Sequence, residues 1–180
     1  MKDAVSQIEN NGGSASYVLC DLSDKEQIKT ATASIGKVDV LINNAGIWQK
    51  MSQLDEVADE DIENVLQVNL TGHILMTKHF LPSLRKSNSP AIINIISKSG
   101  VTSQEGQSVY TASKWGMRGF TEVLRNDLKE DGIRIGAVYQ SGTATDMFAK
   151  AGEEVPKEKF TDPKDLAKVI SFMLNQPDKL

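Results

Sequence analysis

Several features that mark other classes of protein are scarce in this chain of 180 residues. It has one cysteine, Cys20, which excludes an internal disulfide and suits a reducing compartment. No apolar run approaches the roughly 18 residues of a membrane span, and the first residues lack the apolar core of a signal peptide. A formal net charge of −4 gives no electrostatic reason to bind nucleic acid or anionic lipid. We therefore expect a soluble cytoplasmic protein that binds neither.

Metal chemistry also has little support in the sequence. The chain has only two histidines, His73 and His79, on one expected helix. Their spacing is neither i,i+3 nor i,i+4, so they do not share a helix face. No cysteine or carboxylate completes a site with them, and we expect no metal.

Apolar runs alternate with amphipathic helical patterns along the whole chain, which predicts one α/β domain over residues 1–180 with a parallel sheet. The expected strands are 14–22, 38–46, 90–97 and 133–140. The expected helices are 2–10, 23–36, 59–86, 107–130 and 162–177. Ser23 with Glu26 forms a capping pattern for the second helix, and Asp162 before Pro163 is the expected cap of the last one.

Four loops with polar residues directly follow the expected strands. They contain Asp21, the Asn-Asn-Ala-Gly stretch at 43–46, Ser97, and "QSGTATD" at 140–146. In open parallel sheets, ligands bind beyond the carboxyl ends of the strands. We therefore expect the functional site at this edge of the sheet.

Tyr110 and Lys114 lie four positions apart on an expected helix, so their side chains share one face. One interpretation is a chance surface pair. The other is an acid/base tyrosine, because an ammonium about 4 Å away would lower the phenol pKa by roughly 3 units from its ordinary value near 10.

Ser97 and Asn69 each allow two interpretations. Ser97 follows a strand on the same edge as the start of the helix with Tyr110, where it could hold a substrate carbonyl or simply cap a turn. Asn69 lies inside a long helix, where asparagine is a mediocre former. It could face solvent, or it could mark a backbone distortion that holds a water.

Taken together, these motifs resemble the short-chain dehydrogenase/reductase family in its compact single-domain branch. The matching residues are "CDL" at 20–22, "NNAG" at 43–46, Asn69, Ser97 and "YTASK" at 110–114. The resemblance covers essentially the whole chain and is greatest to the carbonyl and 3-oxoacyl reductases. It implies a Rossmann-like, doubly wound parallel sheet and an NAD(P)-dependent oxidoreductase that acts on a small carbonyl or alcohol.

The resemblance also implies residue roles. Tyr110 would exchange the proton of the substrate oxygen and Ser97 would polarise that oxygen. Lys114 would lower the Tyr110 pKa and hold the nicotinamide ribose, and Asn69 would anchor a water linked to Lys114. The remaining contacts to NAD or NADP would come from two groups. Asp21, Leu22, Asn44, Ala45 and Gly46 would meet the adenosine, and Thr143 and Thr145 would meet the carboxamide.

The sequence departs from the family pattern in two places. No G-x-x-x-G-x-G turn occurs, so we expect the sheet to be incomplete, without its first two strands. The chain ends soon after "NQPDKL", so we expect the last edge strand to be absent as well. The strand at 14–22 would then lack both expected neighbours, and the chain would bind a nicotinamide dinucleotide poorly. The second departure is Gln140-Ser141, which stands where relatives usually have Pro-Gly.

Apolar residues outside the core stripes of the two long helices, together with the resemblance, predict a homodimer or homotetramer. They are Leu75, Met76, Phe80, Trp115, Met117 and Phe120. Trp48, Trp115 and Met147 could line a substrate pocket or serve ordinary packing, and 151–160 resembles a lid. The alternative function is a non-catalytic fragment of this family that acts as an oligomerisation or interaction module. An epimerase or dehydratase of the extended branch is a weaker alternative, because the chain is too short for a substrate domain.

Overall fold

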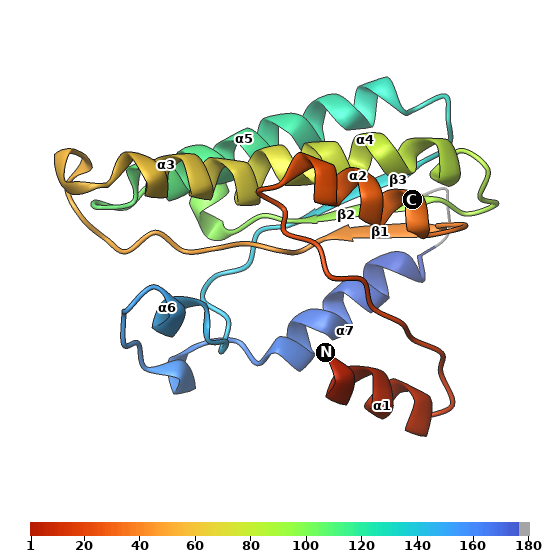
Figure 1. Cartoon of the computed structure of the whole chain (residues 1–180), viewed down its shortest axis with the longest axis horizontal. Helices are drawn as coiled ribbons and strands as arrows, with labels where there is room; N and C mark the ends of the chain where they lie inside the picture. The colour runs from red at the N-terminus through yellow and green to blue at the C-terminus, as the bar shows by residue number, and fades with distance from the viewer. Residues whose placement is uncertain (177–180) are drawn as a thin grey trace.

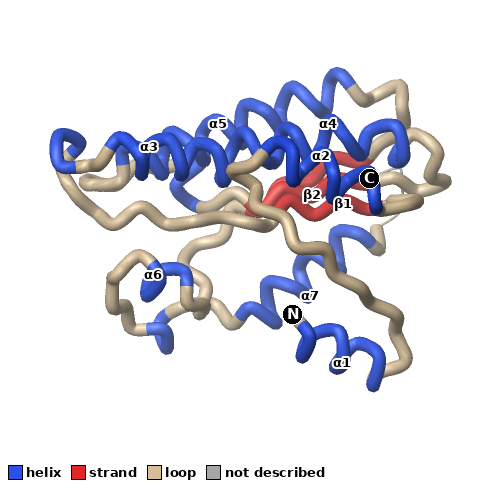
Figure 2. The backbone as a smooth tube through the Cα atoms, in the orientation of Figure 1, coloured by secondary structure: helices blue, strands red, loops and turns tan. Residues whose placement is uncertain are grey.

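The computed structural model describes residues 1–176 and shows an α/β fold in three layers (Figure 1). A small parallel sheet lies between a layer with α2, α3, α4 and α5 and a second layer with α1, α6 and α7; Figure 2 shows the strands at the centre. The strands are β1 (Val40–Asn43), β2 (Ala91–Ile95) and β3 (Arg134–Val138). The longer helices are α1 (Lys2–Asn10), α2 (Lys25–Ser34), α3 (Asp59–Leu66), α4 (Gly72–Leu84), α5 (Ser108–Asp127) and α7 (Pro163–Leu174). The short turns are η1 (Leu54–Glu56), η2 (Gln67–Thr71), η3 (Lys98–Gly100), α6 (Met147–Lys150) and η4 (Lys157–Lys159).

The sheet has the order β1-β2-β3, and both pairs are parallel, as predicted. All five residues of the central strand β2 are buried, whereas burial alternates along β1. Leu41 and Asn43 face the helices, but Val40 and Ile42 on the other face of β1 are 38% and 43% exposed. The carboxyl ends of the three strands meet at one edge, which is where the sequence predicts the site.

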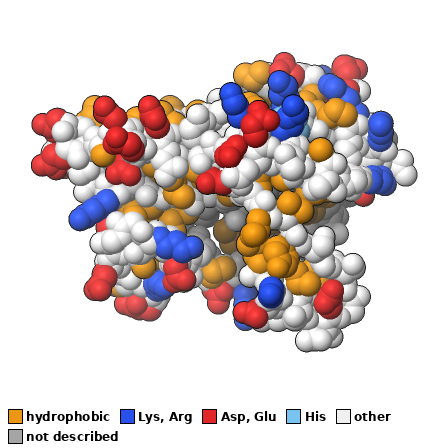
Figure 3. Space-filling view, in the orientation of Figure 1, with side chains coloured by type: hydrophobic (Ala, Val, Ile, Leu, Met, Phe, Trp, Pro, Cys, Tyr) orange, Lys and Arg blue, Asp and Glu red, His pale blue; other side chains and the backbone are white. Residues whose placement is uncertain are grey.

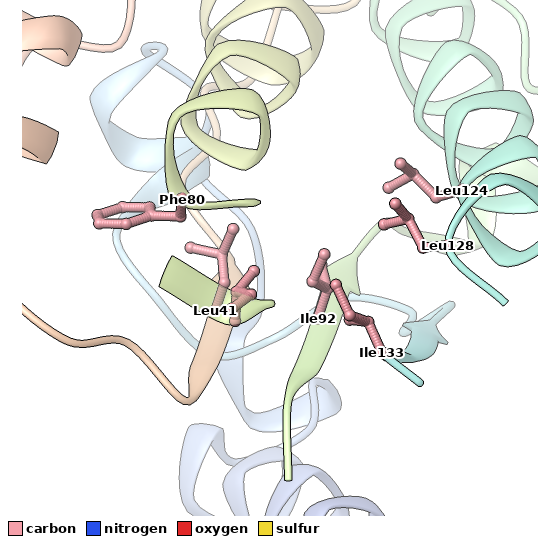
Figure 4. Close-up of a cluster of buried hydrophobic side chains, with 7 residues drawn as sticks. Leu41, Phe80, Ile92, Leu124, Leu128 and Ile133 are labelled. Atoms are coloured by element: carbon pink, nitrogen blue, oxygen red, sulfur yellow. The ribbon is translucent and has the colours of Figure 1, made fainter. Parts of the chain in front are cut away.

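The core lies between the sheet and the helices α4 and α5 (Figure 4). It contains Leu41, Phe80, Leu84, Ile92, Leu124, Leu128 and Ile133. Phe80 is buried there, and Met117 is fully buried as well. The sequence interpretation that these two side chains lie outside the core is therefore wrong. Met76 and Phe120, which it also placed outside the core, pack against the same cluster.

The expected strand over 14–22 is wrong. Residues 13–21 form no strand, and Tyr17, Val18 and Leu19 are 44%, 46% and 72% exposed. A strand is stable when its backbone groups pair with a neighbour. Within residues 1–176 no strand lies beside this segment, so its high β propensity is not realised.

The helix ends follow capping chemistry, with one shift from the prediction. Asp24, rather than Ser23, caps α2, because its carboxylate accepts hydrogen bonds from the backbone N–H groups of Glu26 and Gln27. Asp162 caps α7 as predicted and accepts from the N–H of Lys164. Helix α7 ends at Leu174, and Pro177 of the expected helix lies outside the described residues. No helix within 1–176 has the length and apolar character needed to cross a membrane.

Candidate active site

A cavity of about 740 Å³ opens at the carboxyl edge of the sheet. Its walls come from the loops after all three strands, from the start of α5 and from the segment around α6. Eight of the residues that the sequence selected line it: Asn44, Ala45, Gly46, Ser97, Tyr110, Lys114, Thr143 and Thr145. Asp21, Leu22 and Asn69, which the sequence also predicted as site residues, do not line it.

Tyr110 and Lys114 lie on the buried face of α5, with 5% and 3% of their surfaces exposed, so the surface-pair interpretation is wrong. The Lys114 ammonium lies 5.5 Å from the centroid of the Tyr110 ring. Burial lowers the pKa of Lys114 to about 8. Burial also raises the pKa of Tyr110, and a hydrogen bond with Ser97 only partly offsets this. The predicted lowering of the Tyr110 pKa is therefore wrong, because desolvation is the larger effect.

Ser97 follows β2 and stands in an unusual backbone conformation. Its φ of 155° makes it the only non-glycine residue with positive φ among the described residues. Its hydroxyl accepts a hydrogen bond from the N–H of Ser99, which caps η3, and it also meets the Tyr110 hydroxyl. Backbone conformations of this kind cost of order 1–3 kcal/mol and gather at functional sites. The turn therefore directs the Ser97 hydroxyl toward Tyr110.

Asn69 is fully buried in η2, a π-helical turn that joins α3 to α4. The backbone distortion that the sequence suggested is confirmed, and the solvent-facing alternative is wrong. The Asn69 side chain accepts from the N–H of Ile47 at 2.8 Å and donates to its carbonyl at 2.9 Å. It also donates to the Ser113 hydroxyl at 3.3 Å, so it ties the loop after β1 to α5. π-turns of this kind are frequent at functional sites.

Gly46 lies where the loop after β1 passes closest to the buried polar groups. A Cβ atom at this position would stand 3.3 Å from the Asn69 Oδ1 and 3.6 Å from the Lys114 Nζ. The missing side chain therefore keeps open the part of the cavity beside Lys114.

His73 supports the same loop, and sequence reasoning did not assign it this role. Its Nε2 lies 2.7 Å from the carbonyl oxygen of Ala45, and the residue is 2% exposed. Burial lowers the His73 pKa to about 4, so the ring is neutral near pH 7 and donates from Nε2. The one signal in the sequence was an unusual polar residue on an apolar helix face.

A buried chain of polar side chains aligns the ends of β1 and β2 and was also missed. The Asn43 amide donates to Thr77 at 3.0 Å and to Asn94 at 2.8 Å. Asn94 in turn donates to Thr121 at 2.8 Å. These bonds connect α4, β1, β2 and α5, and each buried amide gains partners that it would otherwise cost free energy to lack.

The loop after β3 brings two unpaired polar atoms to the cavity. The Thr143 Oγ1 and the Gln140 Oε1 are buried and have no hydrogen-bond partner. Residues 142 and 143 are held in place by backbone pairing with Thr161. The Thr145 hydroxyl accepts from the N–H of Met147 at 3.4 Å. A ligand that carries an amide N–H donor and an acceptor oxygen could therefore form hydrogen bonds with the Gln140 and Thr143 side chains.

Asp21 and Leu22 lie on the loop before α2. The exposed Asp21 carboxylate accepts from the N–H and the hydroxyl of Ser23, both at 2.8 Å, and these bonds lower its pKa. Leu22 packs against the start of α4, where a Cβ on Gly72 would approach its carbonyl oxygen to 2.6 Å. The structure thus places both residues on a neighbouring loop rather than in the cavity.

Aromatic and thioether side chains form another part of the cavity wall. Trp48 and Met147 line the cavity, whereas Trp115 is 48% exposed on α5 with the Arg118 guanidinium 5.6 Å from its ring. The interpretation as pocket residues is therefore confirmed for Trp48 and Met147 and is wrong for Trp115. Segment 151–160 contributes Glu153, Val155 and Phe160 to the wall.

Comparison with known proteins finds relatives that are named as reductases. The chain is 34% identical over 182 residues to a 3-oxoacyl-[acyl-carrier-protein] reductase of Synechocystis, covering 96% of this chain and 73% of the relative. It is 36% identical over 167 residues to carbonyl reductase family member 4 of Xenopus tropicalis, covering 88% and 70%. Both bear out the resemblance seen in the motifs.

Solved structures share the fold. A 3-ketoacyl-(acyl-carrier-protein) reductase of Brucella melitensis complexed with NADH matches 99% of this chain and 79% of its own, with a TM-score of 0.83 and 26% identity. Other structures of the same fold are complexes with NADP or NADPH. The short chain dehydrogenase model matches residues 1–156, so this chain belongs to the short-chain dehydrogenase family.

Proposed function

We propose that the protein is an NAD(P)-dependent oxidoreductase that transfers a hydride between a nicotinamide and a carbonyl or alcohol substrate. One observation carries this proposal: a buried tyrosine, a hydrogen-bonded serine and a buried lysine share one cavity at the carboxyl edge of the sheet. The non-catalytic alternative has no such observation in its favour.

Tyr110 is the proposed acid/base. Because burial keeps its pKa above the ordinary value, the phenol is protonated near pH 7 and can donate its proton to a substrate oxygen during carbonyl reduction. Ser97 donates a hydrogen bond to the same oxygen and polarises the carbonyl. Lys114 stabilises the negative charge that remains on Tyr110, and in the oxidation direction Tyr110 takes the proton back.

Asn69 acts through its neighbours. Its amide fixes Ile47, and with it the loop that carries Gly46 past Lys114. We also assign it the water that links Lys114 to solvent, so that the proton lost by Tyr110 can be replaced.

The residues at this edge fit the nicotinamide end of a nicotinamide dinucleotide. The unpaired Thr143 Oγ1 and Gln140 Oε1 match the amide group of a carboxamide, and the space at Gly46 admits a ring beside Lys114. Bound there, the cofactor supplies or accepts the hydride that the protein cannot provide. Thr143 and Thr145 would hold the carboxamide, Lys114 the ribose, and Asn44, Ala45, Asp21 and Leu22 the adenosine.

We further propose that the protein works in the cytoplasm as a homo-oligomer. The outer faces of α4 and α5 expose Ile74 (36%), Trp115 (48%) and Val123 (55%). Pairing of these faces between two copies would bury the three side chains. Light scattering of the wild type and of Trp115→Glu tests this assembly: the wild type should be a dimer or larger, and the variant a monomer.

The function is tested by following the loss of NADH or NADPH absorbance with a panel of ketones. Ser97→Ala should lower kcat/KM by about 10²–10⁴-fold, because a polarising group on the reacting oxygen is lost. Ser103→Ala changes an exposed serine on the same connection and should leave the rate unchanged. Equal rates for the wild type and Ser97→Ala would contradict the proposal.

A further inference from the structure

Glu153 joins two segments of the cavity wall that lie far apart in the sequence. Its Oε2 accepts a hydrogen bond from the Trp48 indole N–H at 2.9 Å. Its Oε1 accepts one from the backbone N–H of Met51 at 2.7 Å. Both carboxylate oxygens are therefore used on the loop after β1, about a hundred residues away from Glu153.

The backbone at the end of α6 aims Glu153 at that loop. Gly152 has a φ of 76°, a conformation that glycine adopts without a steric penalty. The N–H of Gly152 donates to Ala149 O and the N–H of Glu153 donates to Phe148 O, both at 3.0 Å. The chain thus ends the helical turn, reverses, and presents the carboxylate to the cavity.

Glu153 holds the indole of Trp48, and this indole contacts Tyr110, the proposed acid/base. The Trp48 and Tyr110 rings lie 4.6 Å apart between centroids, at an interplanar angle of 61°. On its other side Trp48 meets Phe148 at 4.7 Å and 63°, and Phe148 meets Phe160 at 5.5 Å. Edge-to-face pairs of this kind are favourable, and the indole N–H has in Glu153 the hydrogen-bond partner that a buried tryptophan usually has.

We propose that Glu153 is a positioning residue that fixes the Trp48 indole as a flat apolar wall beside Tyr110, and so selects carbonyl substrates with a flat apolar substituent. The selection of substrate rests on the proposed function; the positioning of Trp48 does not. A carboxylate suits the task because it accepts from two separate donors, and charge-assisted hydrogen bonds are stronger than neutral ones. Glu154, the next residue, is exposed and makes neither contact, so it provides a matched control.

The first experiment measures acrylamide quenching of Trp48 fluorescence in a Trp115→Phe background, without cofactor or substrate. Free N-acetyltryptophanamide in the same buffer gives the reference for a fully exposed indole. Glu153→Ala should raise the quenching constant of Trp48 toward that reference and shift its emission to longer wavelength. Glu153→Gln, which keeps one acceptor oxygen, should give an intermediate value, and Glu154→Ala should give none of the change.

Circular dichroism of each variant shows whether it is folded, and Glu153→Gln carries the test if Glu153→Ala is not. An unchanged Trp48 quenching constant in the folded Glu153 variants would overturn the proposal. An equal change in Glu154→Ala would also overturn it, because the effect would then not depend on the two contacts of Glu153.

The second experiment separates substrate selection from chemistry. With NADPH or NADH, Glu153→Ala should raise the KM for acetophenone by about tenfold, the factor that corresponds to 1.4 kcal/mol, with little change in kcat. The KM for acetone, which has no flat substituent, should change little. An equal rise for both ketones would overturn the selection. If the wild type reduces neither ketone, the failure falls on the proposed function, and the fluorescence still decides the role of Glu153.

Discussion

Residues 91–95 and residues 17–20 are both short apolar runs that precede a polar loop, but they lie in opposite surroundings. The first run is β2, buried at every position between two paired strands. The second has no strand partner within the described residues, and its Leu19 is 72% exposed. The comparison shows that pairing and coverage, more than the preference of single residues, decide whether an apolar run becomes a strand.

The same contrast extends to the helices around the two runs. Helix α5 buries seven residues, among them Tyr110 and Lys114, whereas α1 buries none. In Figure 3, hydrophobic side chains gather on the surface below the sheet, on the side of α1 and α7, where Figure 1 shows the segment before α2 crossing. The proposed catalytic residues thus lie in the part of the molecule that contains the hydrophobic core, which is formed by the sheet with α4 and α5.

The largest expected difference between the two regions is the cost of removing an apolar side chain. Ile92→Ala deletes a fully buried side chain from the core and should lower the free energy of unfolding by about 2–5 kcal/mol. Leu19→Ala should change it by less than about 0.5 kcal/mol, because that side chain is already in water. Urea unfolding of both variants provides the measurement. Similar losses would mean that 17–20 packs as tightly as β2.

The pH dependence of stability should come from the buried half. The unfolded chain protonates His73 below its ordinary pKa near 6.5, whereas the folded chain keeps it neutral down to about pH 4. The free energy of unfolding should therefore fall as the pH decreases from about 6.5 to about 4, by up to about 3 kcal/mol. His73→Gln should remove this part of the slope, and His79→Gln, at an exposed position, should keep it. If the free energy of unfolding of His73→Gln still falls between pH 6.5 and pH 4 as in the wild type, other groups cause the pH dependence.

The helix caps should contribute less to the free energy of unfolding, and about equally in both regions. Asp24→Ala removes the cap of α2 before the sheet, and Asp162→Ala removes the cap of α7 at the other end of the chain. Each should cost about 1 kcal/mol, since the first turn loses its acceptor. Thermal or urea unfolding measures both. A loss several times larger for one of them would show that its carboxylate has a further partner.

The smallest expected effect lies in α1. Ile8 is 45% exposed on a helix without buried residues, so Ile8→Ala should change the free energy of unfolding by less than about 0.5 kcal/mol. Hydrogen exchange should likewise show the amides of α1 less protected than those of α5. Slow exchange in α1, equal to that of α5, would contradict the contrast between the two regions.

The sequence predicts three of the strands, their parallel arrangement, the long helices and the edge of the sheet that holds the cavity, because hydrophobic periodicity and strand-end loops are local signals. It fails at 14–22, where the outcome depends on a partner that no local signal contains. It also fails for the Tyr110 pKa. Spacing along a helix indicates the neighbouring charge of Lys114, but the depth of burial that raises the pKa is a property of the folded chain.

Other parts of the site could not be predicted because distant residues build them. The Asn43–Asn94 bond needs the register of β1 against β2, which places these residues opposite each other. The contact of Glu153 with Trp48 needs the turn at Gly152. Asn69 is intermediate: its residue type indicated a distortion, but only the structure shows that its amide holds Ile47.

The kcat for ketone reduction by Tyr110→Phe tests the central claim most directly. This change removes the buried hydroxyl that meets Ser97 and leaves the ring that packs on Trp48. The account predicts that kcat falls by about 10²–10⁴-fold, while the fold is kept. Tyr17→Phe makes the same change at a half-exposed tyrosine in the N-terminal region and should leave kcat unchanged. A Tyr110→Phe variant that keeps most of the wild-type kcat would contradict the account.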